Sequence, residues 1–145
     1  MPVRLELVVD ANPLVSALLG GQSLRVLFSS LFRCVTTERT TWEVKRYIPM
    51  IAERSDVPEA EVLALFETFP LMAYQSSFYE AYSALATERI GGRDPKDIDI
   101  LALAYRLRTP LWTEDHDLQG LNDIQTVTTE ELRQIILREG LSGQQ

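Results

Sequence analysis

The segment LELVVDANPLVSALL, residues 5–19, decides the fold class of this chain. Its first five residues form a compact apolar run that is typical of a buried β-strand, and the run ends on Asp10. Asn12 and Pro13 then open a second apolar stretch, which predicts a helix closed by the glycines at positions 20 and 21. A strand that leads through a short loop into a helix is the first half of a βαβ unit, from which parallel sheets are built.

Short strands alternate with helices along the rest of the chain, and no change in composition marks a linker. Further strands are predicted at residues 33–36, 71–74, 111–113 and 125–127. Helices are predicted at residues 23–31, 37–54, 58–69, 76–90, 95–108 and 129–138. This alternation predicts one α/β domain, with a mostly parallel sheet covered by helices on both faces. We assign the domain to residues 1–139 and expect residues 140–145 to be a flexible tail.

The composition is that of one globular domain. The 145 residues include 14 basic and 21 acidic side chains, which gives a formal charge of −7, and 46% of the residues are hydrophobic. This apolar content is sufficient for a core. No apolar run approaches the roughly 20 residues of a membrane-spanning helix, and the start of the chain does not resemble a signal peptide. We therefore expect a cytoplasmic protein that does not associate with membranes.

The rare residues exclude several kinds of chemistry. Cys34 is the single cysteine and His116 the single histidine, so internal disulfides, cysteine-based zinc sites and multi-histidine sites are excluded. A Cys34–His116 catalytic dyad remains as an alternative, although a cysteine in a β-like run is more often a buried, inert thiol. The sequence contains no nucleophile elbow, dinucleotide-binding fingerprint or P-loop. The remaining chemistry is that of carboxylates.

Several carboxylates are predicted to meet at one edge of the sheet. Asp10 ends the first strand and Asp115 follows the fourth, and ligands bind outside the carboxyl ends of parallel strands. The helix that begins near Asp94 and Asp97 starts at the same edge. Glu43 lies within its helix, but its side chain points back toward the start of that helix. We therefore expect these acids to line one crevice.

A cation is needed to neutralise such a crevice, because neighbouring carboxylates repel one another. Lys96 is the one basic residue that stands at these positions. With only oxygen ligands on offer, Mg²⁺ or Mn²⁺ is the expected ion. Such a site suits phosphoryl transfer. A divalent ion lowers the pKa of a bound water and stabilises the charge that builds on the phosphate.

Three segments and Glu43, taken in order, resemble the PIN-domain nucleases, which include the VapC-type toxin ribonucleases. The segments are VVDANPLVSALL (residues 8–19), DPKDIDILALAYRL (94–107) and PLWTEDHDL (110–118). Each segment is weakly specific, but their order and spacing form a specific signal. The resemblance implies a three-layer α/β/α PIN-like domain. It also implies a metal-dependent endoribonuclease that hydrolyses the phosphodiester bonds of RNA and acts as the toxin of a toxin–antitoxin pair.

The resemblance also implies roles for individual residues. The catalytic acids would be Asp10, Glu43, Asp97 and Asp115, of which Asp10, Asp97 and Asp115 would bind Mg²⁺ or Mn²⁺. The accessory residues would be Asn12, which orients the first acid, and Asp94, Thr113 and Asp117. The choice of Asp97 over Asp94 and Asp99 depends on its spacing from Ala102 and Ala104.

Two features depart from the family pattern. Ala11 stands where a hydroxyl residue is frequent, so one hydrogen bond to the acidic site is missing. Many toxins of this type also have a basic surface, whereas this chain has an isoelectric point of about 4.7. RNA binding would then depend on the metal and on local cations. The candidates are Arg39, Lys45, Arg46 and Arg93.

The acids also have structural explanations. Asp94 and Asp97 fit a capping box, Asp10 fits an Asx turn, and Glu43 could pair with Arg46 three residues later. A non-catalytic PIN-like module that binds protein or RNA is therefore the alternative function. An aspartyl phosphatase is weaker, because such enzymes usually have a second aspartate where this chain has Asn12.

The expected partners are the RNA substrate, an antitoxin protein and a second copy of the chain. Aromatic residues between positions 58 and 90 exceed what a small core must bury, which indicates a surface for a homodimer or an antitoxin. Ordinary helix packing is an equally good explanation for them. These residues are Phe66, Phe69, Phe78, Tyr79 and Tyr82. Trp42 and Tyr47 are interpreted as core or interface residues, with base stacking as the less favoured alternative.

Overall fold

Five parallel strands form the central sheet of the computed structural model, which describes residues 4–91 and 95–142. The strands are β1 (Leu5–Val9), β2 (Phe32–Thr37), β3 (Leu71–Tyr74), β4 (Leu111–Trp112) and β5 (Thr126–Val127). Their order is β3-β2-β1-β4-β5, and every neighbouring pair is parallel. The predicted α/β class is confirmed. Each predicted strand overlaps an observed one with its ends within one residue.

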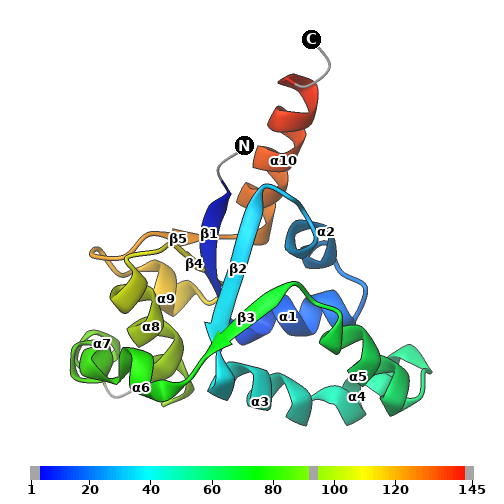
Figure 1. The fold of residues 1–145 in the computed structure, drawn as a ribbon, viewed down its shortest axis with the longest axis horizontal. Helices are drawn as coiled ribbons and strands as arrows, with labels where there is room; N and C mark the ends of the chain where they lie inside the picture. The colour runs from blue at the N-terminus through cyan, green and yellow to red at the C-terminus, as the bar shows by residue number, and fades with distance from the viewer. Residues whose placement is uncertain (1–3, 92–94, 143–145) are drawn as a thin grey trace.

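The two faces of the sheet pack against separate apolar cores, because successive side chains of a strand point to opposite faces. In β1, Leu7 and Val9 belong to the first core and Val8 belongs to the second. In β4, Trp112 belongs to the first core and Leu111 to the second. These four aliphatic side chains and the indole are at most 2% exposed. The sheet is therefore the middle layer of the three-layer α/β/α architecture that the sequence predicts (Figure 1).

Helices from different parts of the chain cover each face. The first core includes side chains from α1 (Ala11–Leu18), α2 (Ser23–Leu27), α3 (Glu38–Arg46), α4 (Ile48–Ser55), α5 (Glu59–Glu67) and α10 (Thr129–Ser142). The second core includes side chains from α6 (Ser76–Tyr79), the 3₁₀ turn η1 (Glu80–Tyr82), α7 (Ser83–Ile90), α8 (Lys96–Leu107) and α9 (His116–Gln119). As predicted from its apolar sequence, α8 is buried through its centre, residues 100–105.

The prediction of one continuous helix at residues 37–54 is wrong. The segment divides at Tyr47 into α3 and α4. Pro49 in the first turn of α4 explains the division, because proline donates no backbone hydrogen bond and its ring clashes with the carbonyl four residues earlier. Proline is tolerated there only because a new helix begins. The predicted helix at 76–90 likewise divides into α6, η1 and α7.

The N-cap of the last helix lies one residue earlier than predicted. Thr128, not Thr129, has the capping role, since its hydroxyl accepts from the Glu131 amide and the Glu131 carboxylate accepts from the Thr128 amide. The Thr129 hydroxyl instead accepts a hydrogen bond from the Trp112 indole, at 3.0 Å. The helix α10 continues to Ser142, four residues beyond the predicted end at Arg138. The short helix α9 was not predicted.

The aromatic residues between positions 58 and 90 mostly serve the two cores. Phe66, Phe69 and Tyr79 are buried, and Phe78 and Tyr82 pack partly buried against the second core. Ordinary helix packing therefore accounts for these five side chains. Within the described residues, no helix is both long enough and apolar enough to cross a membrane.

Candidate active site

The described members of the predicted acidic set meet at the carboxyl edge of the sheet. Asp10 directly follows β1, and Asp115 lies three residues after β4. Glu43 comes from α3, and Asp97 comes from the first turn of α8. These side chains line one open cleft of about 530 Å³. The cleft is lined by Asp10, Ala11, Asn12, Glu43, Tyr47, Lys96, Asp97, Asp115 and Asp117.

Asp10 is the buried member of this set, with 8% of its surface exposed. Its Oδ1 accepts a hydrogen bond from the Ala11 amide at 2.8 Å, and its Oδ2 accepts one from the Thr113 hydroxyl at 2.7 Å. Burial raises the pKa of Asp10 above its ordinary value, the two hydrogen bonds oppose this rise, and the charges of Glu43 and Asp115 add to it. The carboxylate is therefore held in a place where its charge is costly.

Thr113 connects two of the acids. Its side chain is fully buried, and its hydroxyl donates to Asp10 while it accepts from the Asp115 amide at 3.0 Å. The Thr113 carbonyl accepts from the Gln119 side chain at 3.2 Å. Asp115 in turn caps α9, because its Oδ1 accepts from the Asp117 amide at 2.9 Å. Gln119 is a supporting residue that the sequence analysis missed, since no motif marks it.

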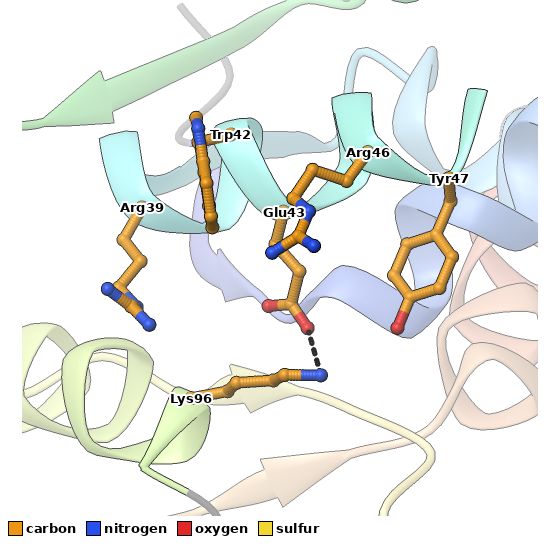
Figure 2. Close-up of a pocket in the computed structure, with 6 residues that line it drawn as sticks. All are labelled: Arg39, Trp42, Glu43, Arg46, Tyr47 and Lys96. Atoms are coloured by element: carbon orange, nitrogen blue, oxygen red, sulfur yellow. Dashed lines mark ion pairs between the residues drawn. The ribbon is translucent and has the colours of Figure 1, made fainter. Parts of the chain in front are cut away.

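Glu43 pairs with a residue from across the cleft. Lys96 Nζ at the start of α8 lies 3.5 Å from Glu43 Oε1 (Figure 2). The predicted alternative partner, Arg46, instead lies with its guanidinium 4.9 Å from the centre of the Trp42 ring. The structural explanation of Glu43 through Arg46 is therefore wrong, and the observed pair joins α3 to α8.

The remaining predicted residues differ in where they lie. Asp97 lines the cleft, whereas Asp99 accepts a hydrogen bond from the Tyr79 hydroxyl in the second layer of helices. Asn12 lies exposed at the cleft, and the described hydrogen bonds to Asp10 come from Ala11 and Thr113 instead. Asp94 and Arg93 lie outside the described residues.

The alternative dyad has no support from the geometry. Cys34 is buried in the first core, while His116 is exposed at the start of α9. Burial raises the pKa of the Cys34 thiol to about 12, which makes its thiolate scarce at neutral pH. Neither residue lines the acidic cleft.

The donor set of the cleft fits a hard divalent cation in its chemistry. Within the described residues, no three side chains of Asp, Glu, His or Cys form a ready-made metal-binding group. Mg²⁺ nevertheless keeps several of its waters and is usually held by one or two carboxylates, so a closed cluster is not required. A cation beside Asp10 would also offset the burial and like charges that raise the pKa of this carboxyl.

A second, smaller cavity of about 260 Å³ adjoins the cleft. It is lined by Arg39, Trp42, Glu43, Arg46, Tyr47 and Lys96, and we call it the basic cavity (Figure 2). Glu43, Tyr47 and Lys96 line both hollows. Trp42 is 53% exposed, so its interpretation as a core residue is wrong. Of the local cations expected to bind RNA, Arg39 and Arg46 line the basic cavity, whereas Lys45 lines neither hollow.

Comparison with known proteins places this geometry in a family. A search of curated protein sequences gave no match. Among solved structures, the chain is similar to a chain in the crystal structure of VapBC2 from Rickettsia felis. That structure is described as bound to a DNA fragment from the VapBC2 promoter. That likeness has a TM-score of 0.59 at 12% identity, and it covers 86% of this chain and 98% of the other, so it shows the fold alone. The family model described as PIN domain matches residues 8–136, and the chain therefore belongs to the PIN-domain family.

Proposed function

We propose that this chain is an endoribonuclease that depends on Mg²⁺ or Mn²⁺ and hydrolyses phosphodiester bonds of RNA. The observation that supports it most is the meeting of Asp10, Glu43, Asp97 and Asp115 in one cleft at the carboxyl edge of the sheet. Membership of the PIN-domain family supports the same assignment. The proposed metal ligands are Asp10, Asp97 and Asp115.

The proposed chemistry divides between the cation and the chain. A divalent cation in the cleft would supply charge neutralisation and a more acidic water for attack on the phosphate. Thr113 would hold Asp10 and Asp115 in fixed relation through its hydroxyl. Glu43 would take up the proton that the attacking water loses, and the leaving oxygen would take up a proton from solvent as its bond to phosphorus breaks. Asn12 and Asp117 would contact waters or substrate at the rim.

We infer that the chain is the toxin of a toxin–antitoxin pair, with an antitoxin protein as partner and a homodimer as its assembly. The fold likeness to a chain of Rickettsia felis VapBC2 supports this inference. We also propose a cytoplasmic location, where a cellular RNA substrate would be available. Size-exclusion chromatography with light scattering tests the homodimer directly, because a dimer would double the 16.5 kDa mass of the chain.

The deciding experiment compares the wild type with Asp10→Asn on single-stranded and structured RNAs, in Mg²⁺, in Mn²⁺ and in EDTA. We expect cleavage that requires metal and is lost in Asp10→Asn. Asp123→Asn is the matched control, because this aspartate binds Arg89 and Tyr105 away from the cleft and should leave cleavage intact. If no protein cuts RNA and calorimetry detects no metal binding to the wild type, the non-catalytic binding module is the better assignment.

A further inference from the structure

One face of α3 gathers cations and aromatic rings beside the acidic cleft. Arg39, Trp42 and Glu43, followed by Arg46 and Tyr47, are spaced three and four residues apart, which places them on one side of a helix. Figure 2 shows Glu43 extending from α3 toward Lys96 of α8, with Arg39, Trp42 and Arg46 extending from the same helix as Glu43. The basic cavity is therefore built by two helices that are distant in sequence.

The charge of the basic cavity is opposite to that of its surroundings. Three cations and one carboxylate line it, in a chain with a formal charge of −7. The adjoining cleft has five carboxylates and Lys96. Among the described residues, neither Arg39 nor Arg46 forms an ion pair, so their charge is available to an anion.

Trp42 gives this cationic surface a flat apolar centre. The residue is 53% exposed, and the guanidinium carbons of Arg39 and Arg46 lie 5.9 Å and 4.9 Å from the centre of its ring. Figure 2 shows the indole edge-on between these two side chains. Long arginine side chains move at small cost, so a ligand ring can take the place of a guanidinium on the indole. A ligand that has both a planar ring and a negative charge suits this arrangement.

The basic cavity is also continuous with the cleft. Glu43, Tyr47 and Lys96 line both, so a ligand bound against Trp42 lies next to whatever occupies the acidic cleft. A polynucleotide meets this condition, because its bases and phosphates alternate along one chain. A single strand fits better than a duplex, since its bases are free to stack on aromatic side chains and on arginine planes.

We propose that Arg39, Trp42 and Arg46 form a subsite for a nucleotide that neighbours the scissile phosphate of a single-stranded RNA. Its base stacks on Trp42, and its phosphate binds the guanidinium groups of Arg39 and Arg46. The subsite deepens the proposed function and rests on it, because it takes the acidic cleft as the place of cleavage. An acidic segment of a protein partner would use the two arginines but gain nothing from the exposed face of the indole.

Binding to an intact RNA tests the subsite without cleavage. The protein is the Asp10→Asn variant in Mg²⁺, and the probe is a short single-stranded RNA of mixed sequence with a fluorescent end label. Acrylamide quenching of tryptophan emission supplies a second readout, because Trp112 is fully buried and the accessible emission comes from Trp42. We expect RNA to shield Trp42 from acrylamide.

Variants in that background separate stacking from charge. Trp42→Ala should weaken RNA binding at least about fivefold, and Trp42→Phe should keep most of the affinity, because a stacked base contributes strongly and any aromatic ring can receive it. Arg39→Ala and Arg46→Ala should each lower the slope of log affinity against log salt by roughly 0.7, the value for one phosphate contact on a single strand. Arg54→Ala is the matched control, because Arg54 is exposed on α4 and lines neither the basic cavity nor the acidic cleft.

The outcomes distinguish this subsite from the proposed function. Equal affinity and salt slope in the Arg39, Trp42 and Arg46 variants and in the Arg54 control would overturn the subsite, even if the wild type cuts RNA. Stronger shielding of Trp42 by an acidic peptide or by duplex RNA than by the single strand would also overturn it. Shielding of Trp42 by the single strand that is reduced in Arg39→Ala and Arg46→Ala, together with weaker RNA binding by Trp42→Ala, supports the subsite, whether or not the wild type proves to be a nuclease.

Discussion

Replacing Asp10 by asparagine should stabilise the protein at neutral pH when no divalent metal is present. The wild-type carboxylate is 8% exposed and lies near the charges of Glu43 and Asp115. Its pKa is raised, which means that the folded state favours the neutral carboxyl more than the unfolded chain does. Asparagine has nearly the same shape and is always neutral. It can also still accept from the Ala11 amide, which lies 2.8 Å from Oδ1.

The size of the effect follows from two opposing contributions. The hydrogen bonds from Ala11 and Thr113 lose their ionic partner, which costs roughly 1 kcal/mol each. Removing a buried charge returns several kcal/mol, and the raised pKa shows that burial outweighs the hydrogen bonds. We expect a net gain of about 1–2 kcal/mol, the usual range for relief of an unfavourable site. For a domain of this size, that corresponds to a rise in Tm of about 2–8 °C.

The pH dependence has a definite sign. Because the folded pKa of Asp10 is raised, its contribution to wild-type stability is most favourable below the ordinary value of 3.8 and declines as the pH rises through the folded pKa. The difference in Tm between Asp10→Asn and the wild type should therefore grow with pH across this window and then level off. Differential scanning calorimetry in EDTA at several pH values measures it.

A control of opposite sign makes the test sharper. Asp123 has a lowered pKa, because the Tyr105 hydroxyl and the Arg89 guanidinium donate to it. Asp123→Asn should therefore lower the Tm, with a loss of unfolding free energy no larger than the roughly 1 kcal/mol that an exposed pair contributes. In Mn²⁺ the wild type should recover relative to Asp10→Asn, because a bound ion stabilises only the protein that binds it. A lower Tm for Asp10→Asn in EDTA at pH 7 would refute the reasoning.

Two other side chains give independent tests. Thr113→Val should lower the free energy of unfolding, measured in urea, by about 2–4 kcal/mol, because it removes a donor from Asp10 and an acceptor from the Asp115 amide. Thr113→Ser should keep most of the stability. A loss in Thr113→Val below about 0.5 kcal/mol, the scale of a neutral surface change, would contradict the bridging role of this hydroxyl. The Cys34 thiol, whose pKa is raised to about 12 by burial, should react with a thiol reagent at pH 8 only as fast as the protein unfolds. Reaction of the native protein at the rate of a free thiol would show that Cys34 is accessible.

The sequence was sufficient to predict the sheet and the position of its acids because those signals are local. The run that ends at Asp10 has the length and polarity of a buried strand, and β1 has the predicted bounds. The choice of Asp97 came from the family resemblance, and helix geometry adds that Asp97 and Asp99 lie on different sides of the helix. Residues two apart on a helix are rotated by about 200°, so Asp97 and Asp99 cannot face the same way. In the structure, Asp97 lines the cleft and Asp99 binds Tyr79.

The contacts that define the rest of the site could not be predicted, because they join distant parts of the chain. Lys96 pairs with Glu43 only because α3 and α8 meet at the sheet edge, and no local pattern favours it over Arg46. Thr113 was matched to a family position, but its bond to Asp10 depends on the pairing of β1 with β4. The exposure of Trp42 likewise depends on how α3 packs against distant parts of the chain.

If the cleft binds the proposed cation and the basic cavity binds RNA, the two binding events should be coupled. Five carboxylates line the cleft, and they repel a polyanion that lies in the basic cavity next to them. A divalent cation in the cleft would remove part of that repulsion, so it would raise the affinity for RNA. By linkage, RNA must then raise the affinity for the cation by the same factor. The Lys96–Glu43 pair lies between the two hollows, so one positive charge remains beside the acids when the cleft is empty of metal. The proposed subsite would in this way let an acidic chain bind RNA at one place while the rest of its surface disfavours nucleic acid.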